Sequence, residues 1–253
     1  MAEYLIFNIF LISFGFSSII FFIVLLFITA GYGQHINKKW GPAINNNKLG
    51  WITMELPTVI IYLIYYLIGE RKTELMPLIF LFIWMIHYSH RTFIYPLLIR
   101  GKHPMPISII LMGITFNGIN TYLQARWINT FSPLYPVNWF FNPIFIIGII
   151  IFICGFIINL HSDYIIRHLR KPRETEYKIP YGGMFKYVSC PSYFGEITEW
   201  IGWAIMTWSF PGLIFAMWTF ANLAPRARSN HLWYIKSFPD YPKNRKALIP
   251  FIF

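Results

Sequence analysis

The sequence predicts an all-α integral membrane protein, a bundle of seven transmembrane helices without a Rossmann domain. Of its 253 residues, 56% are hydrophobic and only 12% are charged, whereas a soluble domain carries about 25% charged residues. Apolar runs long enough to cross a bilayer recur along the chain, and Lys and Arg gather between alternate runs. We therefore expect one membrane-embedded domain over residues 1–253.

Each transmembrane helix is expected where an apolar run approaches 20 residues, the length that crosses a bilayer. Five such runs lie at about 5–30, 51–68, 75–98, 106–129 and 139–160. The stretch 194–225 is too long for one span, and Pro211-Gly212 within it predicts a tight turn. We therefore expect two further helices, at about 194–209 and 211–225.

The placement of Lys and Arg predicts the orientation of the bundle. With the N-terminus outside and the C-terminus in the cytosol, most of the 21 Lys and Arg residues fall in cytosolic segments, as the positive-inside rule requires. The largest of these segments are a loop at 161–193 and a tail at 226–253. The tail is expected to begin with a short amphipathic helix at about 226–237.

Several polar side chains lie inside the predicted spans. They are Glu55, His87, Tyr88, His90 and Arg91. A charge at the centre of a spanning helix costs about 2.5–3.5 kcal/mol on insertion scales, so such residues usually face a partner or a cavity. They predict a polar chamber in the cytosolic half of the membrane. A polar seam between helices, with Glu55 as a carboxylate at a helix end, is the simpler interpretation.

The segment after the fifth span carries candidate anion-binding residues. Asn159, Asp163 and either Arg167 or Arg170 recur on one helical face, and Arg170, Lys171 and Arg173 could clamp phosphate groups. A basic patch attracted to anionic lipid is the alternative. Glu196 and Glu199 add carboxyl groups at the start of the next span, where they could pair with arginine or bind a ribose.

Other chemistries lack their signatures. The sequence contains neither GxGxxG after a strand nor the GxxxxGK[ST] phosphate loop. Its seven histidines supply only one short pair, at 87 and 90, so we expect no metal site. The net charge of +11 is confined to loops, which argues against a nucleic-acid partner. Cys154 and Cys190 lie far apart, and no disulfide framework is expected.

Longer motifs resemble one known family, the steroid 5α-reductases. The segments that carry the resemblance are "GYGQH" (31–35), "ELP" (55–57), "HYSHRTFIYPLL" (87–98), "INLHSDYIIRHLRKP" (158–172), "YKIPYGGMFKYVS" (177–189), "GEITEWIGWA" (195–204) and "DYPKNRKALIPFIF" (240–253). They run in order from about residue 31 to the end of the sequence. Matches this long and irregular are specific beyond a shared hydropathy profile.

The resemblance implies a seven-helix enzyme that uses NADPH to reduce the Δ4 double bond of a 3-oxosteroid. It implies that Glu55 and Tyr88 are the catalytic pair that holds the 3-keto oxygen, and that Tyr32 and Trp51 also contact the substrate. The residues that it implies for the cofactor are Arg91, Tyr95, Lys102, Asn159, Asp163, Arg170, Tyr177, Glu196, Arg226 and Tyr234. Membrane lipid is a further expected partner, and a monomer is compatible with the sequence.

The sequence departs from the family pattern at three positions. Met54 stands where the family has Gln beside the catalytic Glu, Ser192 replaces an Asn that contacts the cofactor, and Asn230 replaces one His of a His-rich stretch. These changes concern the substrate and the cofactor affinity rather than the class of reaction.

Other functions are also compatible with the sequence. The nearest is a reductase of another lipid alkene, either a polyprenol or a long-chain enoyl thioester. A membrane methyltransferase that uses S-adenosylmethionine shares a short helical bundle with a C-terminal cofactor pocket. A small transporter is disfavoured because no inverted repeat is evident. The membrane is expected to be a bacterial inner membrane, or the endoplasmic reticulum in a eukaryote.

Overall fold

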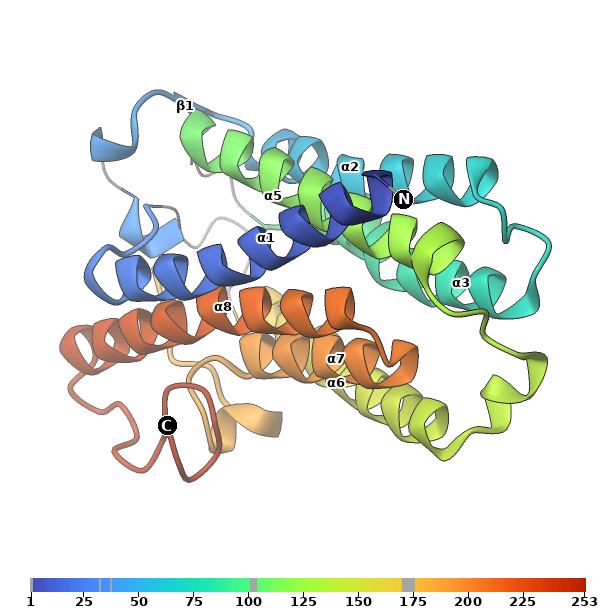
Figure 1. Ribbon diagram of the computed structural model, residues 1–253. Coiled ribbons are helices and arrows are strands. Elements are labelled where there is room, and N and C mark those ends of the chain that lie inside the picture. Colours follow the sequence, from blue (N-terminus) through green and yellow to red (C-terminus); the bar gives the residue numbers. More distant parts are fainter. Residues whose placement is uncertain (1, 32, 37, 101–103, 170–175) are drawn as a thin grey trace. The chain divides into compact units, whose positions relative to one another are not determined.

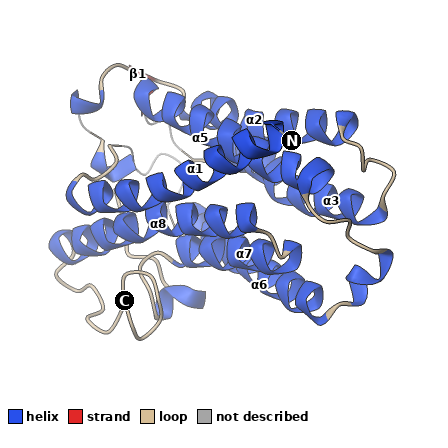
Figure 2. Ribbon diagram, viewed as in Figure 1, coloured by secondary structure: helices blue, strands red, loops and turns tan. Residues whose placement is uncertain are grey.

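The computed structural model describes the chain except for residues 1, 32, 37, 101–103 and 170–175. Helices make up most of the described part (Figures 1 and 2). The principal helices are α1 (Ala2–Phe27), α2 (Asn47–Ile68), α3 (Leu75–Ser89), α4 (Tyr95–Leu98), α5 (Ile107–Arg126), α6 (Pro143–His168), α7 (Pro191–Thr207) and α8 (Phe210–Ser237). The predicted helical character is confirmed.

Shorter elements connect or extend these helices. The described 3₁₀ turns are η1 (Gly33–His35), η2 (Lys38–Trp40), η5 (Val137–Phe141) and η6 (Gly183–Lys186), and the π-helical turns are η3 (His90–Ile94) and η4 (Trp127–Phe131). Strands β1 (Ala43–Ile44) and β2 (Met105–Pro106) form a two-stranded antiparallel sheet in which Ala43 pairs with Pro106. The expected all-α fold therefore includes one small sheet, and the described residues contain no Rossmann-like sheet.

Three described helices, α1, α2 and α6, are long and apolar enough to cross a membrane. Seven spans and their orientation stay predictions. Among the other helices, α3 has 15 residues and α7 has 17, so at 1.5 Å per residue each is shorter than a hydrocarbon core of about 30 Å. The helical path of α3 nevertheless continues through η3 and α4 to Leu98.

Two predicted boundaries are wrong. α6 continues to His168, beyond the expected end at 160, and α8 continues through Pro225 to Ser237 without the expected break at 225. A proline inside a helix removes one backbone hydrogen bond. In α8 the cost is offset by packing, because Ala224, Ala227 and Tyr234 are buried along the same helix.

The chain reverses between α7 and α8 at Trp208 and Ser209, just before Pro211-Gly212, where the turn was predicted. Trp208 ends α7 in the left-handed conformation, with φ of 43°. Ser209 is the N-cap of α8, and its hydroxyl accepts a hydrogen bond from the Gly212 amide at 3.1 Å. The Ser209 and Thr207 hydroxyls lie 2.8 Å apart. Pro211 fits the first turn of α8, where its missing N–H costs nothing.

The contacts divide the chain into two compact units. Unit 1 comprises residues 1–12 and 30–145, and unit 2 comprises residues 13–29 and 146–253. Unit 1 therefore contains α2 to α5, and unit 2 contains most of α6 together with α7 and α8.

Within unit 2, α6 and α7 meet along glycines spaced by seven residues on each helix. These are Gly148 and Gly155 on α6, and Gly195 and Gly202 on α7. A Cβ added at Gly155 would lie 2.4 Å from the Glu199 backbone nitrogen, and one at Gly202 would lie 2.4 Å from the Phe152 nitrogen. The two antiparallel backbones therefore touch directly, as small residues allow in membrane bundles.

We predict that Gly155→Ala destabilises the protein. Its added methyl group meets backbone rather than a flexible side chain, so α6 and α7 must separate, at a cost of about 1–3 kcal/mol. Loss of helical circular dichroism on heating the detergent-solubilised protein measures the effect.

Gly118→Ala is the matched control, because its Cβ would meet only Ile61 Cδ1, at 3.7 Å. Alanine favours a helix over glycine by about 1 kcal/mol, so the control should unfold no earlier than wild type. Equal midpoints for Gly155→Ala and wild type would contradict the close contact.

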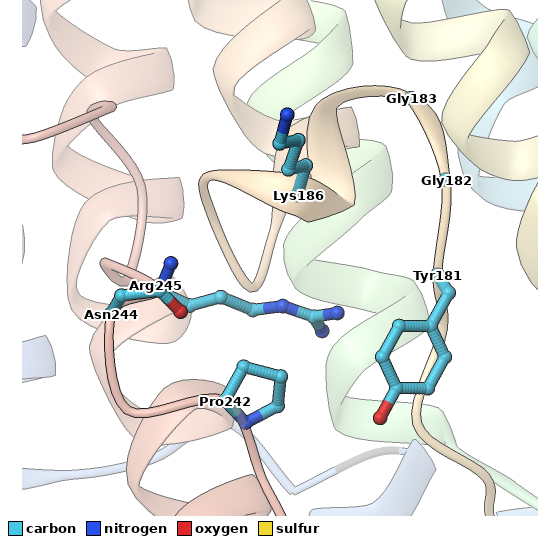
Figure 3. A pocket seen from close by; sticks show the side chains of 7 residues that line it. All are labelled: Tyr181, Gly182, Gly183, Lys186, Pro242, Asn244 and Arg245. Carbon is cyan, nitrogen blue, oxygen red and sulfur yellow. The ribbon is translucent and has the colours of Figure 1, made fainter.

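The C-terminal segment of unit 2 pairs with the segment before α7. The Ser189 amide donates to the Lys246 carbonyl at 2.8 Å, the Lys246 amide donates to the Tyr187 carbonyl at 2.9 Å, and the Cys190 amide donates to the Ala247 carbonyl at 3.2 Å. Beside this pairing, residues of the two segments line a cavity (Figure 3).

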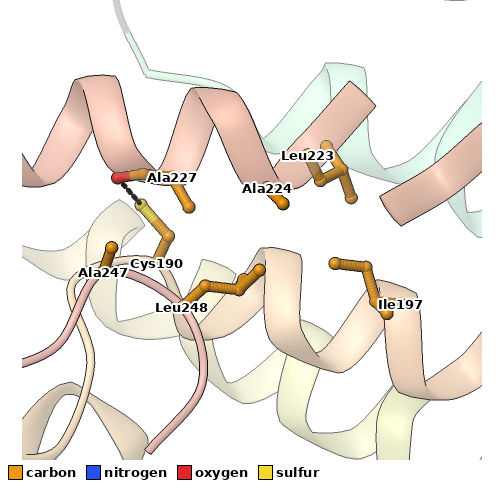
Figure 4. Close-up of a cluster of buried hydrophobic side chains, with 7 residues drawn as sticks. All are labelled: Cys190, Ile197, Leu223, Ala224, Ala227, Ala247 and Leu248. Atoms are coloured by element: carbon orange, nitrogen blue, oxygen red, sulfur yellow. Dashed lines mark hydrogen bonds between the residues drawn. The ribbon is translucent and has the colours of Figure 1, made fainter. Parts of the chain in front are cut away.

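An apolar cluster underlies the same pairing. Its buried members are Cys190, Ile197, Leu223, Ala224, Ala227, Ala247 and Leu248 (Figure 4). The Cys190 thiol points at the Ala227 carbonyl oxygen, 3.9 Å away. Burial raises the pKa of this thiol to about 12, against the opposing effect of the Asn230 amide that donates to the sulfur. Cys190 is therefore a neutral, covered thiol at physiological pH.

We predict that Cys190 reacts with a maleimide dye only when the protein unfolds, because the thiolate is the reactive form. The Cys154→Ala protein isolates this signal, since Cys154 is exposed. Its labelling should rise with the unfolding transition. Rapid labelling of native Cys154→Ala protein would show that the cluster is open.

Candidate functional site

In unit 1, Glu55 is buried on α2 and held by α5. The Asn117 side-chain amide donates one hydrogen bond to Glu55 Oε2 at 3.1 Å and another to the Met54 carbonyl at 2.8 Å. The helices approach closely here, since a Cβ added at Gly113 would lie 2.0 Å from Met54 Cγ. One carboxyl oxygen of Glu55 is thus fixed as an acceptor, which orients the group.

Tyr88 belongs to a chain of contacts between α2 and α3. The Thr58 hydroxyl donates to the Glu55 carbonyl at 2.6 Å, and the Trp84 indole N–H donates to the Thr58 carbonyl at 3.1 Å. The Trp84 ring in turn packs against the Tyr88 ring, with centroids 4.5 Å apart. Glu55 is 8% exposed and Tyr88 is 4% exposed, so both candidate catalytic groups are buried within unit 1.

The structure gathers Trp51, Arg91 and Tyr95. The Arg91 guanidinium lies 5.4 Å from the Trp51 ring centroid and 4.8 Å from the Tyr95 centroid, and the two rings make a T-shaped contact at 5.5 Å. Arg91 lies in η3, where the Tyr95 amide bonds to the His90 carbonyl five residues earlier. Pro96 follows this turn and cannot donate a helical hydrogen bond. π-helical turns of this kind are frequent at functional sites.

His87 contributes to packing beside Tyr88. Its side chain is 2% exposed, and its ring makes a T-shaped contact with the Tyr88 ring at 4.8 Å. In the part of the chain that the structure describes, no three His, Cys, Asp or Glu residues are grouped so as to hold a metal ion.

In unit 2, Asn159 joins α6 to α7. Its amide donates to the Ser192 carbonyl at 3.1 Å and to Glu196 Oε2 at 3.3 Å. Gly195 permits this contact, because a Cβ there would lie 2.6 Å from the backbone nitrogen of Asn159. The structure thus brings together Asn159 and Glu196, two of the predicted cofactor residues, and Asp163 follows one turn later on α6.

Arg226 and Asn230 lie one turn apart on α8 and both contact Tyr193. The Arg226 guanidinium is 5.5 Å from the Tyr193 ring centroid, and the Asn230 amide donates to the Tyr193 hydroxyl at 3.5 Å. Tyr193 was not among the predicted site residues. Its neighbour Ser192, which departs from the family pattern, accepts a hydrogen bond from the Asn159 amide through its backbone carbonyl.

The predicted cofactor residues Tyr177 and Tyr234 share one aromatic neighbour. The Trp233 ring lies 5.0 Å from each of their centroids. Tyr234 also stacks on Tyr241 at 5.1 Å. The Tyr241 hydroxyl and His231 Nδ1 each lie 2.6 Å from the Ser189 hydroxyl. Burial raises the pKa of Tyr241, against its hydrogen bond with Ser189 and the nearby Arg245.

Some predicted residues cannot be placed. Tyr32, Lys102 and Arg170 lie outside the described residues, as do Lys171 and Arg173 of the expected phosphate clamp. The other predicted cofactor residues fall in both units: Arg91 and Tyr95 belong to unit 1, and the remainder belong to unit 2.

The sequence interpretation missed Asn117 and Arg245. Asn117 carried the same signal as Glu55, a polar side chain in an apolar run, and it proves to be the direct partner of that carboxyl. Arg245 lies in a basic tail where nothing distinguishes it from Lys243 or Lys246, and only the structure shows that it is buried.

Comparison with known proteins assigns the chain to a family. Residues 103–253 match the model of the family described as 3-oxo-5-alpha-steroid 4-dehydrogenase. The chain belongs to this family. The steroid 5-alpha-reductase DET2 of Arabidopsis thaliana is 43% identical over 239 residues, which cover 91% of this chain and 90% of that protein.

An animal relative gives the same result. The human 3-oxo-5-alpha-steroid 4-dehydrogenase 1 is 43% identical over 227 residues, which cover 88% of this chain and 86% of that protein. The match to the family model begins after Glu55 and Tyr88, but it includes Asn117 and all the candidate residues of unit 2. The resemblance seen in the sequence motifs is confirmed at the level of the family.

Proposed function

We propose that this protein is an NADPH-dependent steroid 5α-reductase. It reduces the Δ4 double bond of a 3-oxo-Δ4 steroid to give the 5α-3-oxosteroid, with a hydride added at C5 and a proton at C4. Membership of the family and the names of the plant and human relatives support the class of reaction. Within the chain, the buried Glu55 carboxyl held by Asn117 is the observation that carries the proposal.

The reaction demands hydrogen-bond donors at the 3-keto oxygen. Hydride addition at the far end of an enone moves negative charge onto the carbonyl oxygen, and donors fixed there beforehand stabilise the transition state. A neutral carboxylic acid and a phenol can both donate. We assign these roles to Glu55 and Tyr88, which are buried on α2 and α3 of the same unit.

The residues around this pair fit an apolar, planar substrate. Trp51 lies one helical turn before Glu55 on α2 and packs its ring against Tyr95. We assign Trp51 to the steroid rings, together with Tyr32 from the sequence motif. Asn117 acts as a positioning residue, because it orients the Glu55 carboxyl without touching the substrate.

The donor set of unit 2 fits a dinucleotide phosphate. Phosphates require cations, and ribose hydroxyls and the nicotinamide require carboxylates and amides. Arg226 over Tyr193 and the Asn159–Glu196 pair supply these groups within one unit. The residues that we assign to the cofactor are Arg91, Tyr95, Lys102, Asn159, Asp163, Arg170, Tyr177, Glu196, Arg226 and Tyr234. When bound, NADPH supplies the hydride that C5 receives.

We also propose a multi-pass membrane location with seven spans, the N-terminus outside and the C-terminus in the cytosol, in a bacterial inner membrane or the endoplasmic reticulum. Large apolar side chains are exposed along α1 and α6, among them Phe16, Phe27 and Ile157, which suits contact with lipid. The substrate and product are themselves apolar, so passage between helices from the lipid side is consistent with this location.

The reaction itself is tested with purified protein in detergent, a 3-oxo-Δ4 steroid and NADPH carrying tritium at the transferred hydrogen. We expect the product to gain two hydrogens by mass and to retain the tritium. A panel containing a polyprenol and a long-chain enoyl thioester tests the related reductases, and labelled S-adenosylmethionine tests methyl transfer. Reduction of a panel alkene with no steroid turnover would overturn the proposed substrate.

Glu55→Leu and Tyr88→Phe should each lower kcat by about 10²–10³-fold, because each substitution removes one such donor. NADPH affinity, measured by fluorescence titration, should be unchanged because neither residue is assigned to the cofactor. Tyr66→Phe is the control, since the Tyr66 hydroxyl bonds only an exposed loop carbonyl of Lys72. Wild-type turnover in both site variants would remove this pair from the mechanism.

Asn159→Ala should raise the KM for NADPH about tenfold, the effect of losing a hydrogen bond that involves a charged group, with a smaller change in kcat. Asn138→Ala, an exposed asparagine in η5, is the control. The unfolding midpoint of each variant separates cofactor binding from stability. An unchanged KM in a stable Asn159→Ala protein would assign Asn159 to packing alone.

A further inference from the structure

Two cations of unit 2, Lys186 and Arg245, are not among the residues assigned above. Tyr181, Gly182, Gly183, Lys186, Pro242, Asn244 and Arg245 line a cavity of about 340 Å³ (Figure 3). One wall is the segment around η6 and the other is the C-terminal segment. We propose that this cavity binds a phosphate group.

Arg245 is the central observation. Its side chain extends across the cavity toward Tyr181 (Figure 3), yet the residue is only 4% exposed. Its Nε and Nη1 atoms are buried and have no hydrogen-bond partner. No carboxylate of the described residues forms an ion pair with it. Buried N–H donors rarely lack a hydrogen-bond partner. A buried positive charge also costs free energy unless an anion is paired with it.

Two aromatic rings hold the Arg245 side chain in place. The guanidinium carbon lies 4.9 Å from the Tyr181 centroid and 5.2 Å from the Tyr241 centroid. Cation–π contact stabilises the charge but leaves the planar N–H edge for another partner. Tyr241 is itself fixed by its hydrogen bond with Ser189. The cation is therefore positioned before any ligand arrives.

The rest of the lining suits the same ligand. Lys186 supplies a second positive charge and Asn244 supplies an amide donor. Gly182 and Gly183 have φ values of 94° and 49°, a region that favours glycine and that brings backbone close to a bound group without a Cβ in the way. Successive backbone amides in such turns form anion-binding concavities.

A phosphate group matches this lining better than a carboxylate does. A phosphate monoester carries a charge of about −1.5 to −2 at neutral pH and offers three acceptor oxygens, enough to engage both cations and the amide. Two sources carry this group: a soluble phosphate, including the 2′-phosphate of NADPH, and the headgroup of an anionic lipid. The cofactor source rests on the proposed function, whereas the phosphate site itself does not.

The site is tested by equilibrium dialysis of labelled inorganic phosphate against the full-length protein in detergent, at constant ionic strength set with chloride. We expect saturable binding that Lys186→Gln and Arg245→Gln each weaken about tenfold, the effect of losing one charge-assisted bond. Lys186 is exposed, so its variant keeps the fold even where Arg245→Gln does not. Lys243→Gln, an exposed neighbour outside the lining, should bind phosphate as wild type does.

Competition then identifies the source. Displacement of phosphate by NADPH but not by NADH points to the 2′-phosphate, and displacement by nanodiscs of phosphatidic acid but not of phosphatidylcholine points to lipid. Displacement by neither leaves free phosphate as the ligand, and each of the three results supports the site. Non-saturable binding, or equal binding by wild type and Lys186→Gln, overturns it. The readout requires no steroid turnover, so it stands or fails separately from the proposed reaction.

Discussion

Close approach of neighbouring helices at glycines is the constraint on which the candidate sites depend. An asparagine side chain is short, so its amide reaches across to a neighbouring helix only where that helix comes close. Gly195 provides the approach for Asn159 on α6, and Gly113 provides it for Asn117 on α5. In each case the amide then donates both to a backbone carbonyl and to a glutamate. The same arrangement therefore orients a carboxyl group in each unit.

This arrangement also explains why polar groups are tolerated in such an apolar chain. A buried carboxyl or amide costs free energy unless it is hydrogen-bonded, and in both units the partner comes from another helix. These polar contacts therefore form only when the two helices are correctly packed. It also divides the chemistry: Glu55 and Tyr88 belong to unit 1, while Asn159, Glu196 and Arg226 belong to unit 2. Arg91 and Tyr95, which are also proposed for the cofactor, belong to unit 1 with Glu55 and Tyr88.

The sequence was sufficient for the helical class, the family and most helix positions, because apolar runs and long irregular motifs are local signals. It was insufficient where tertiary contacts determine a helix boundary or the partner of a side chain. Proline usually ends a helix, but α8 continues past Pro225 because side chains along its buried face are packed on both sides of this residue. The π-helical turn at His90–Ile94 has no periodic signature, although Pro96 lies just after it. Asn117 and Arg245 gain their meaning only from neighbours more than 60 residues away, Glu55 and Tyr181.

Aromatic packing of cations links the unusual composition of the chain to its chemistry. One fifth of the residues are aromatic, and the net charge is +11. Arg91 lies over Trp51 and Tyr95, Arg226 over Tyr193, and Arg245 over Tyr181 and Tyr241. In general, a carboxylate partner neutralises a guanidinium and occupies its N–H donors. An aromatic ring stabilises the charge from the face and leaves the edge donors directed outward. For Arg245, whose buried Nε and Nη1 atoms have no hydrogen-bond partner, this leaves N–H donors for the phosphate group proposed above.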